Sequence, residues 1–436
     1  MKRRFACLLL FFLVNALVQP LPAQVGQQLA GQGQGQHERA KKSRFNSYSG
    51  WIMAGYQGWF NAEGDGAGRG WNHYRKGTTF APGSTSVEAW PEMEEYPKKY
   101  KTAFVYANGA PAYVFSSYDE STVNLHFKWM KDYAIDGAFM QRFVVTLKDA
   151  KGLAHTKKVF GAAVQAAREH DRAIAVMYDL SGMRPEDYEV VIRDWKQLVE
   201  EYRFRDRNAN ANYLFHRKKP LVAIWGVGFN DSRRYGLAEA EKLIDFFRND
   251  PQYGGCALML GVPTYWRDLH KDTQEDARLH DLIKKVDIVH PWFVGRYNQD
   301  TYPVFQARIV DDIAWCKQYK LDYVPTVFPG FSWQNLKPGA PFDAIPRNKG
   351  QFLWKQLAGA LEARARMVYV AMFDEIDEAT AIFKCSQEVP VGASRFLPYE
   401  KGIPSDHYMW LTGQAGRMLK KQIPFQKTMP VRAHQP

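Results

Sequence analysis

Eight short apolar runs, separated by segments of helical pattern, constrain this chain more than any other feature of its sequence. Each run is almost continuously apolar, as a strand buried on both faces must be. The runs cover residues 49–59, 136–143, 173–180, 220–227, 256–262, 287–294, 322–328 and 367–373. Helices are predicted at residues 121–133, 156–170, 185–202, 236–249, 274–285, 304–319, 347–366 and 405–420. Eight strands alternating with eight helices predict an α/β protein with a single (β/α)8 TIM barrel and extended loops after its strands.

A doubly wound open sheet is the competing architecture. It usually carries a Gly-rich phosphate turn after its first strand, and the segment Gly55-Tyr-Gln-Gly58 does not match that pattern. The 436 residues are enough for one large barrel or two ordinary domains. No boundary is visible inside the mature chain, so we predict a catalytic barrel over residues 45–425 and a C-terminal tail over 426–436.

The N-terminus has the organisation of a processing segment. Three basic residues at positions 2–4 precede an apolar stretch at 6–17, and Pro22-Ala23 offers a cleavage point before Gln24. The apolar stretch is too short for a stable membrane span. We therefore predict a signal peptide over 1–23, a Gln- and Gly-rich flexible leader over 24–44, and a secreted or periplasmic protein.

The charge and the cysteine content limit which partners and cofactors the chain is expected to bind. The formal net charge is +12, but no basic run or nucleic-acid motif accompanies it, so no nucleic-acid partner is expected. The charge either favours an acidic or sulfated polysaccharide or is a solvated surface. The mature chain has Cys256, Cys316 and Cys385, whose spacing fits no metal motif. The three cysteines can form one disulfide or be buried free thiols, and the sequence does not decide between these alternatives. No cofactor is predicted.

The last apolar run stops abruptly in four acidic residues: Asp374, Glu375, Asp377 and Glu378. Carboxylates at the end of a buried strand are unfavourable unless something pairs with them or uses them. In a barrel this end of the strand is where catalysis is placed. A hard cation such as Ca²⁺ and a structural acidic cap are alternative uses. Because no Asx-Gly loop of regular ligand spacing surrounds the acids, we predict no metal site.

Two crowded carboxyl groups suit glycosidic bond cleavage, which needs one protonated acid and one ionised carboxylate. Crowding separates their pKa values, so both forms coexist near neutral pH. Aromatic, amide and guanidinium groups at the other strand ends complete a pocket typical of sugar sites. The predicted substrate-binding residues are Tyr56, Gln57, Trp71, His73, Gln141, Arg142, Asp179, Trp225, Tyr265, Trp266, His290, Trp292, Arg296, Asp374 and Asp377. Barrel-wall packing is the alternative for Trp225, and a structural ion pair is the alternative for Arg142 and Arg296.

Two segments resemble glycoside hydrolase family 99 and the related 71/99-like proteins. The first is Gly55-Tyr-Gln-Gly-Trp-Phe60, and the second is Asp374-Glu-Ile-Asp-Glu-Ala-Thr380. The family motif is close to Asn-Glu-Trp-x-Glu-Gly-Thr, so both glutamates and Thr380 match. Asp374, Ile376 and Ala379 replace the family's Asn, Trp and Gly. The best known members are endo-α-1,2-mannosidases and endo-α-1,2-mannanases, so the resemblance implies an oligo- or polysaccharide substrate with an α-mannoside first.

The resemblance also implies a mechanism and roles for the two glutamates. Family members are thought to retain configuration through a 1,2-anhydro sugar. Carried over by position, Glu375 would be the base that acts on the sugar's 2-hydroxyl, and Glu378 the general acid and then base. A pentose-containing or anionic plant or algal polysaccharide is the alternative substrate, since Ile376 departs from the family. A non-catalytic carbohydrate-binding barrel is the alternative from another class.

Overall fold

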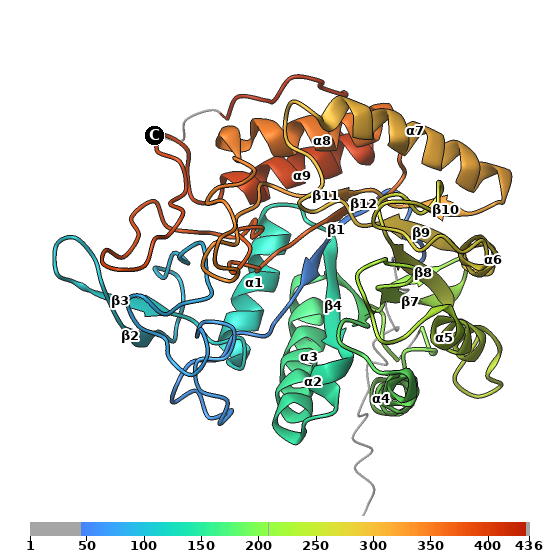
Figure 1. Cartoon of the computed structure of the whole chain (residues 1–436), viewed down its shortest axis with the longest axis horizontal. Helices are drawn as coiled ribbons and strands as arrows, with labels where there is room; N and C mark the ends of the chain where they lie inside the picture. The colour runs from blue at the N-terminus through green and yellow to red at the C-terminus, as the bar shows by residue number, and fades with distance from the viewer. Residues whose placement is uncertain (1–44, 208, 433–436) are drawn as a thin grey trace, which may run out of the picture. The chain divides into compact units, whose positions relative to one another are not determined.

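A computed structural model describes residues 45–207 and 209–432 of the chain (Figure 1). The predicted signal peptide (1–23) and flexible leader (24–44) lie outside the described residues, as does the end of the predicted tail (433–436). Over the described residues, no helix is long and apolar enough to cross a bilayer. Cys256, Cys316 and Cys385 are buried free thiols, which settles the alternatives left open for the cysteines.

Parallel strands form the centre of the molecule. The strand order is β10-β9-β8-β7-β5-β4-β1-β12-β11, and every neighbouring pair is parallel. Their bounds are β1 (Ile52–Tyr56), β4 (Gly137–Phe143), β5 (Ala173–Asp179), β7 (Lys219–Trp225), β8 (Ala257–Val262), β9 (Ile288–Pro291), β10 (Asp322–Tyr323), β11 (Thr326–Val327) and β12 (Val368–Val370). Each predicted strand is present at its expected place.

The two ends of this strand order belong to one segment of the chain. β10 pairs with β9, whereas β11 pairs with β12, and only Val324 and Pro325 separate them. The Val324 N–H donates to Val289 O at 2.9 Å, and the Pro325 carbonyl accepts from Tyr369 N at 3.1 Å. Since proline has no N–H, it interrupts the ladder at this point. The segment is thus the seventh strand, it closes the sheet, and the predicted (β/α)8 barrel is confirmed.

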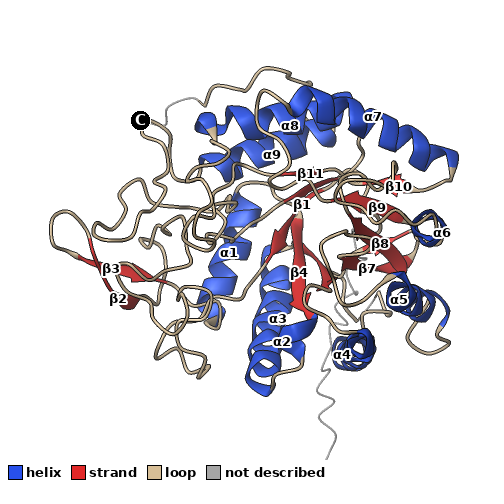
Figure 2. Cartoon of the chain, viewed as in Figure 1, coloured by secondary structure: helices blue, strands red, loops and turns tan. Residues whose placement is uncertain are grey.

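Helices surround the strands, as Figure 2 shows. Their bounds are α1 (Glu120–Asp132), α3 (Ala150–His170), α4 (Tyr188–Tyr202), α5 (Leu237–Asn249), α6 (Arg278–Lys284), α7 (Tyr302–Gln318), α8 (Gln351–Glu362) and α9 (His407–Leu419). Local signals set their ends. The Asp149 side chain caps α3 by accepting from Gly152 N at 2.7 Å, and Pro185 opens the 3-10 turn that leads into α4. All eight overlap the predicted helices.

The sequence analysis missed the structure inside the extended loops. The loop after β1 contains an antiparallel hairpin, β2 (Tyr100–Val105) and β3 (Pro111–Val114), which lies to one side of the barrel (Figure 1). A one-turn helix, α2 (Val144–Leu147), follows β4, and β6 (Phe215–His216) pairs with β7. These elements are short, and their stability comes from packing on the barrel, which leaves little periodic signal in the sequence.

Candidate active site

The first and last strands are joined at their carboxyl ends by Asp374. Its Oδ1 accepts from Gln57 N and its Oδ2 from Gly58 N, both at 2.8 Å. Gly58 has φ of +58°, which glycine adopts without strain. A Cβ at Gly55 would lie 2.0 Å from the Tyr369 hydroxyl, so only glycine fits there. The segment that resembles family 99 on β1 is therefore shaped to meet the acidic segment after β12.

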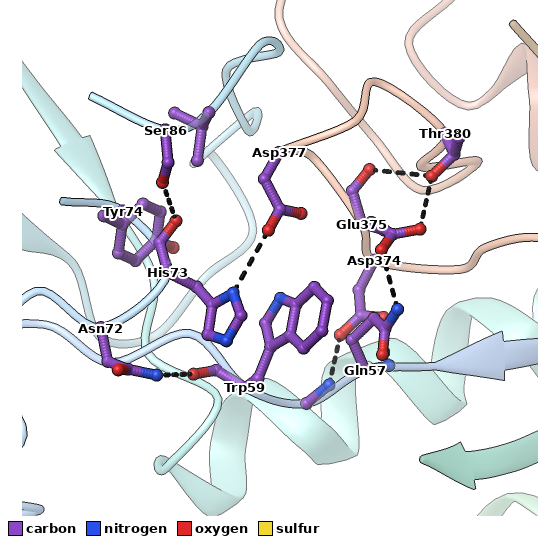
Figure 3. Close-up of polar contacts among 12 residues, drawn as sticks. Gln57, Trp59, Asn72, His73, Tyr74, Ser86, Asp374, Glu375, Asp377 and Thr380 are labelled. Carbon is purple, nitrogen blue, oxygen red and sulfur yellow. Dashed lines mark hydrogen bonds and ion pairs between the residues drawn. The ribbon is translucent and has the colours of Figure 1, made fainter. Parts of the chain in front are cut away.

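Glu375 is held by two hydrogen-bond donors (Figure 3). Its Oε1 accepts from Gln57 Nε2 and its Oε2 from Thr380 Oγ1, both at 2.8 Å. The side chain is 6% exposed, so these donors replace water around the carboxylate. Such donors stabilise the ionised form of the acid, which gives Thr380 of the family motif a physical role.

Glu378 has a different environment. Its side chain lines the adjoining cavity and is partly accessible, and no side-chain hydrogen bond to it is found within residues 45–207 and 209–432. Its neighbour Asp377 is buried, and Asp377 Oδ2 lies 3.3 Å from His73 Nδ1. His73 in turn stacks on Trp59 with ring centroids 3.8 Å apart and planes 6° apart (Figure 3). Withdrawal from solvent lowers the pKa of His73 to about 3, so this ring is neutral at neutral pH.

All four acids resist ionisation because they are buried together. Burial raises the pKa of Asp374 and of Asp377 to about 7. Burial, with Asp377 adding to it, raises the pKa of Glu378 to about 8. Burial also raises the pKa of Glu375 well above its ordinary value, with the Glu378 charge adding and the hydrogen bond from Thr380 opposing. The cluster therefore holds protonated and ionised carboxyl groups side by side near neutral pH.

A cavity of about 200 Å³ opens over the two glutamates. Its walls are Gln57, Trp59, Gln141, Phe143, Asp179, Ser181, Trp225, Trp292, Met372, Glu375 and Glu378. Pockets for drug-sized ligands measure roughly 300–1,000 Å³, so this one suits a single ring. The rings of Trp225 and Trp292 meet edge to face, 5.3 Å apart at 75°. Trp225 Nε1 and Gln57 Oε1 are buried with no partner in the described part of the chain, which leaves a donor and an acceptor for a ligand.

Seven of the predicted site residues line this cavity. They are Gln57, Gln141, Asp179, Trp225, Trp292, Glu375 and Glu378. Burial raises the pKa of Asp179 to about 6, with a hydrogen bond from Ser181 opposing. The sequence analysis missed Trp59, Phe143, Ser181 and Met372 as lining residues. The first three lie two positions after Gln57, Gln141 and Asp179, so the two-residue period of a strand was the signal that could have found them.

Four predicted residues lie behind the cavity. Asp374, Asp377 and His73 contact the residues that form its wall, as described above. His290 is also buried, and its Nδ1 lies 3.1 Å from Val324 O. Its ring is 4.5 Å from that of Tyr369, whose hydroxyl accepts from Gln141 Nε2 at 2.8 Å. These four residues therefore support the wall from behind.

Tyr56 is a correction to the predicted substrate-binding set, and Arg142 lies outside the cavity over the glutamates but lines a neighbouring one. The Tyr56 hydroxyl bonds to His126 Nδ1 at 2.9 Å, and Arg142 Nε donates to Asp194 at 2.7 Å; both side chains are fully buried. Successive residues of a strand point to opposite faces. Because Gln141 faces the barrel interior, its neighbour Arg142 faces the surrounding helices, and the ion-pair alternative holds for it.

The loops after β8 and β9 supply the remaining corrections. Trp266 is fully buried against Trp315, and Arg296 Nε lies 3.3 Å from Asp272. Tyr265 lies between two cations, Lys271 at 4.2 Å and Arg308 at 4.4 Å. These aromatic and basic groups pack among themselves and do not line the cavity over the glutamates.

Trp71 is the last correction, in the loop after β1. Its Nε1 donates to Glu63 at 3.2 Å, and its ring packs on Phe80. Within the described residues, no group of three His, Cys, Asp or Glu side chains is arranged to hold a metal ion.

A parallel α/β barrel with paired glutamates after its last strand is the architecture of many glycoside hydrolases. No protein-family model matches the chain. A solved structure described as a glycoside hydrolase-like protein shares this fold: 75% of this chain and 94% of that one align, with a TM-score of 0.50 and 12% identity.

Closer likenesses point to one family. The GH99 endo-alpha-mannosidase from Bacteroides thetaiotaomicron aligns over 85% of this chain and 98% of its own, with a TM-score of 0.63 and 15% identity. Its complex with BIS-TRIS-propane aligns over 86% of this chain and 98% of its own, with a TM-score of 0.62 and 15% identity. Glycoprotein endo-alpha-1,2-mannosidase from Mus musculus is 20% identical over 398 residues, 85% of this chain and 75% of that protein. The chain is similar in sequence and in fold to these family 99 proteins, and the predicted resemblance is confirmed.

Proposed function

We propose that this protein is a retaining glycoside hydrolase that cleaves an α-linked glycan, with an α-mannoside as the first candidate. One observation carries the proposal: Glu375 and Glu378 line the same cavity in unlike environments. Two donors hold Glu375 and oppose the rise in its pKa that burial and the neighbouring acids cause. Glu378 has none of these donors, and burial raises its pKa to about 8. We assign the base to Glu375, whose carboxylate the two donors stabilise, and the acid to Glu378.

The two glutamates act in two steps. In the first, Glu375 takes the proton of the sugar's 2-hydroxyl, O2 attacks C1, and Glu378 protonates the departing oxygen as its bond to C1 breaks. The product of this step is a 1,2-anhydro sugar. In the second, Glu378 takes a proton from water, the water oxygen attacks C1 as the C1–O2 bond breaks, and Glu375 returns its proton to O2. Each step inverts C1, so the configuration is retained overall.

The stereochemistry of this route favours an α-mannoside, because its 2-hydroxyl can lie trans-diaxial to the leaving group. The names of the relatives support the same choice, since they are endo-α-mannosidases. Ile376, which replaces the family's Trp, is fully buried, and its carbonyl accepts from Glu88 N at 2.9 Å. It is not among the residues that line the cavity.

Around the glutamates, each wall has a separate task. Trp225 and Trp292 offer apolar faces to the C–H surface of a sugar, and the unpartnered Trp225 Nε1 can donate to a hydroxyl. Asp374 fixes the backbone of Gln57, whose side chain in turn orients Glu375. Preorganised groups of this kind lose little freedom on binding.

Export is part of the proposal. It is supported by the basic residues at 2–4, the apolar stretch at 6–17 and the small residues before Gln24. Sequencing the N-terminus of the protein from culture fluid or periplasm tests it, with Gln24 expected as the first residue. A mature protein that still begins with Met1 would contradict it.

The catalytic proposal is tested with α-mannan and a panel of other polysaccharides, reading product size by mass spectrometry and anomeric configuration by NMR. Glu375→Gln and Glu378→Gln should each abolish turnover with the fold intact, whereas the exposed Glu362→Gln control should not. A substrate with 2-deoxy sugar units should resist cleavage. Near-wild-type activity in either glutamate variant, or an inverted product, refutes the mechanism. Glycan binding unaffected by both variants, with no product, would support a non-catalytic barrel instead.

A further inference from the structure

A second cavity of about 180 Å³ adjoins the first. Gln57, Trp59, Gln141 and Phe143 line both cavities, so the two cavities lie side by side and share these walls. The second cavity, called the side cavity below, continues past these residues to Val159 and Phe160 of α3. Trp59, seen at the centre of Figure 3, is one of the walls between them.

The charged residues of the two cavities are opposite in sign. The side cavity is lined by the cations Arg69 and Arg142 and by no Asp or Glu, while its two histidines, His73 and His155, are neutral because burial lowers their pKa. The catalytic cavity has three carboxyl groups in its walls and no Lys, Arg or His. An anionic group on the substrate would be repelled from the catalytic cavity and accepted in the side cavity.

Two arginines of the side cavity have unused donors. Arg142 gives Nε and Nη2 to Asp194, but its buried Nη1 has no hydrogen-bond partner in the described part of the chain. Arg69 donates Nη1 to the neutral Asn61 Oδ1 at 3.0 Å, and none of the described carboxylates lies within 4.0 Å of it. Burial lowers the pKa of Arg69, and the charges of Asp149 and Asp65 oppose this only in part.

The remaining walls strengthen this arrangement. Phe143, Val145, Val159 and Phe160 are apolar, so they exclude water and raise the strength of any charge-assisted hydrogen bond. Asp194 pairs with Arg142, whereas Arg69 has no carboxylate within 4.0 Å in the described part of the chain. A ligand that supplies several acceptor oxygens and one negative charge would satisfy both guanidinium groups.

We propose that the side cavity binds an anionic substituent, a sulfate ester or a carboxylate, carried by a sugar at or next to the cleaved bond. The assignment of that group to the substrate rests on the proposed glycosidase activity. The anion-binding site itself rests on Arg69 and Arg142 alone. The natural glycan is then an acidic one, in keeping with the formal net charge of +12.

Isothermal titration with sodium sulfate and, separately, sodium acetate tests the site, with NaCl holding the ionic strength constant. We expect saturable binding of at least one anion, and the stronger of the two indicates a sulfate ester or a carboxylate. Arg69→Gln should weaken it by about tenfold or more, the effect of removing one charge-assisted hydrogen bond. Arg69→Lys should retain most of it. The matched control is Arg75→Gln, an exposed arginine of the same loop outside the side cavity, which should bind as the wild type does.

The substrate assignment has a separate readout. Wild-type kcat/KM is compared on an anionic glycan and its neutral counterpart, and Arg69→Gln should lower only the former. The absence of saturable anion binding, or an equal loss in the Arg69 and Arg75 variants, overturns the site. Anion binding that depends on Arg69 without hydrolysis of any glycan would instead uphold the site and refute the proposed hydrolase.

Discussion

Replacing Asp374 by Asn should remove a pH-dependent loss of stability that the wild type undergoes as pH rises. Asp374 is fully buried, its Oδ1 accepts from Gln57 N, and its Oδ2 accepts from Gly58 N. A protonated carboxyl still offers an acceptor on each oxygen, whereas the nitrogen of a carboxamide only donates. Below pH 7, where Asp374 is protonated, the variant should therefore be less stable than the wild type by about 1–3 kcal/mol, the effect of one lost buried hydrogen bond.

The size of the pH-dependent stability difference between the two proteins follows from the pKa of Asp374. Burial raises the pKa of Asp374 from 3.8 to about 7, a shift of about 3 pH units. Because the folded pKa is raised, its stabilising contribution is complete below pH 3.8 and is lost as pH rises to 7. Each unit corresponds to about 1.4 kcal/mol, so the whole loss is about 4 kcal/mol. Between pH 5 and pH 9 the wild type should lose about 3 kcal/mol that the Asn variant keeps.

Urea unfolding of both proteins at pH 5, 6, 7, 8 and 9 measures this difference, since all other titrating groups are common to the pair. The free energy of unfolding of the variant relative to the wild type should rise up to about pH 7 and then level off. A difference that is constant with pH, or one that favours the wild type as pH rises, would show that Asp374 is ionised in the folded protein throughout and that the reasoning is wrong.

Three further predictions concern catalysis and packing. The rate of hydrolysis should fall as pH rises through about 8, because Glu378 then loses the proton that the leaving oxygen needs. A substrate with an activated aryl leaving group should show a weaker fall. Equal pH profiles on both substrates would argue against Glu378 as the acid. His73→Ala should reduce kcat/KM by about tenfold with little change in unfolding, because Trp59 loses the ring stacked on it; unchanged kinetics would show that the stacking does not position Trp59. Arg142→Met should destabilise the fold by about 3–5 kcal/mol in urea unfolding, because it leaves the Asp194 carboxylate buried without its cation. Adding Asp194→Leu should recover much of the lost stability. Additive losses in the double variant would contradict this prediction.

The barrel could be predicted because its signal is repeated. Each of its strands is buried on both faces, so it reads as an apolar run, and the helices between the runs carry their own caps and period. The hairpin β2–β3 and the helix α2 have no comparable signal, since short elements depend on what they pack against.

The candidate site could be predicted in part. A strand end marks where a pocket lies, but which side chain enters it depends on the pleat. Gln141 and Arg142 are adjacent, yet Gln141 lines the catalytic cavity whereas Arg142 pairs with Asp194 on α4. For Tyr265 and Trp266, the loop conformation decides whether the side chain enters the pocket, and a loop has no sequence periodicity from which this could be predicted.

By itself, the sequence determined the number and order of the strands and the position of Glu375 and Glu378 at the end of the last one. These follow from local hydrophobicity and from one short motif. Only the tertiary structure decided what surrounds the glutamates. His73 meets Asp377 across 304 residues of chain, and Gln57 reaches Glu375 across 318. Contacts so distant in sequence exist because the barrel closes and brings its first strand beside its last, and that closure is a property of the whole fold.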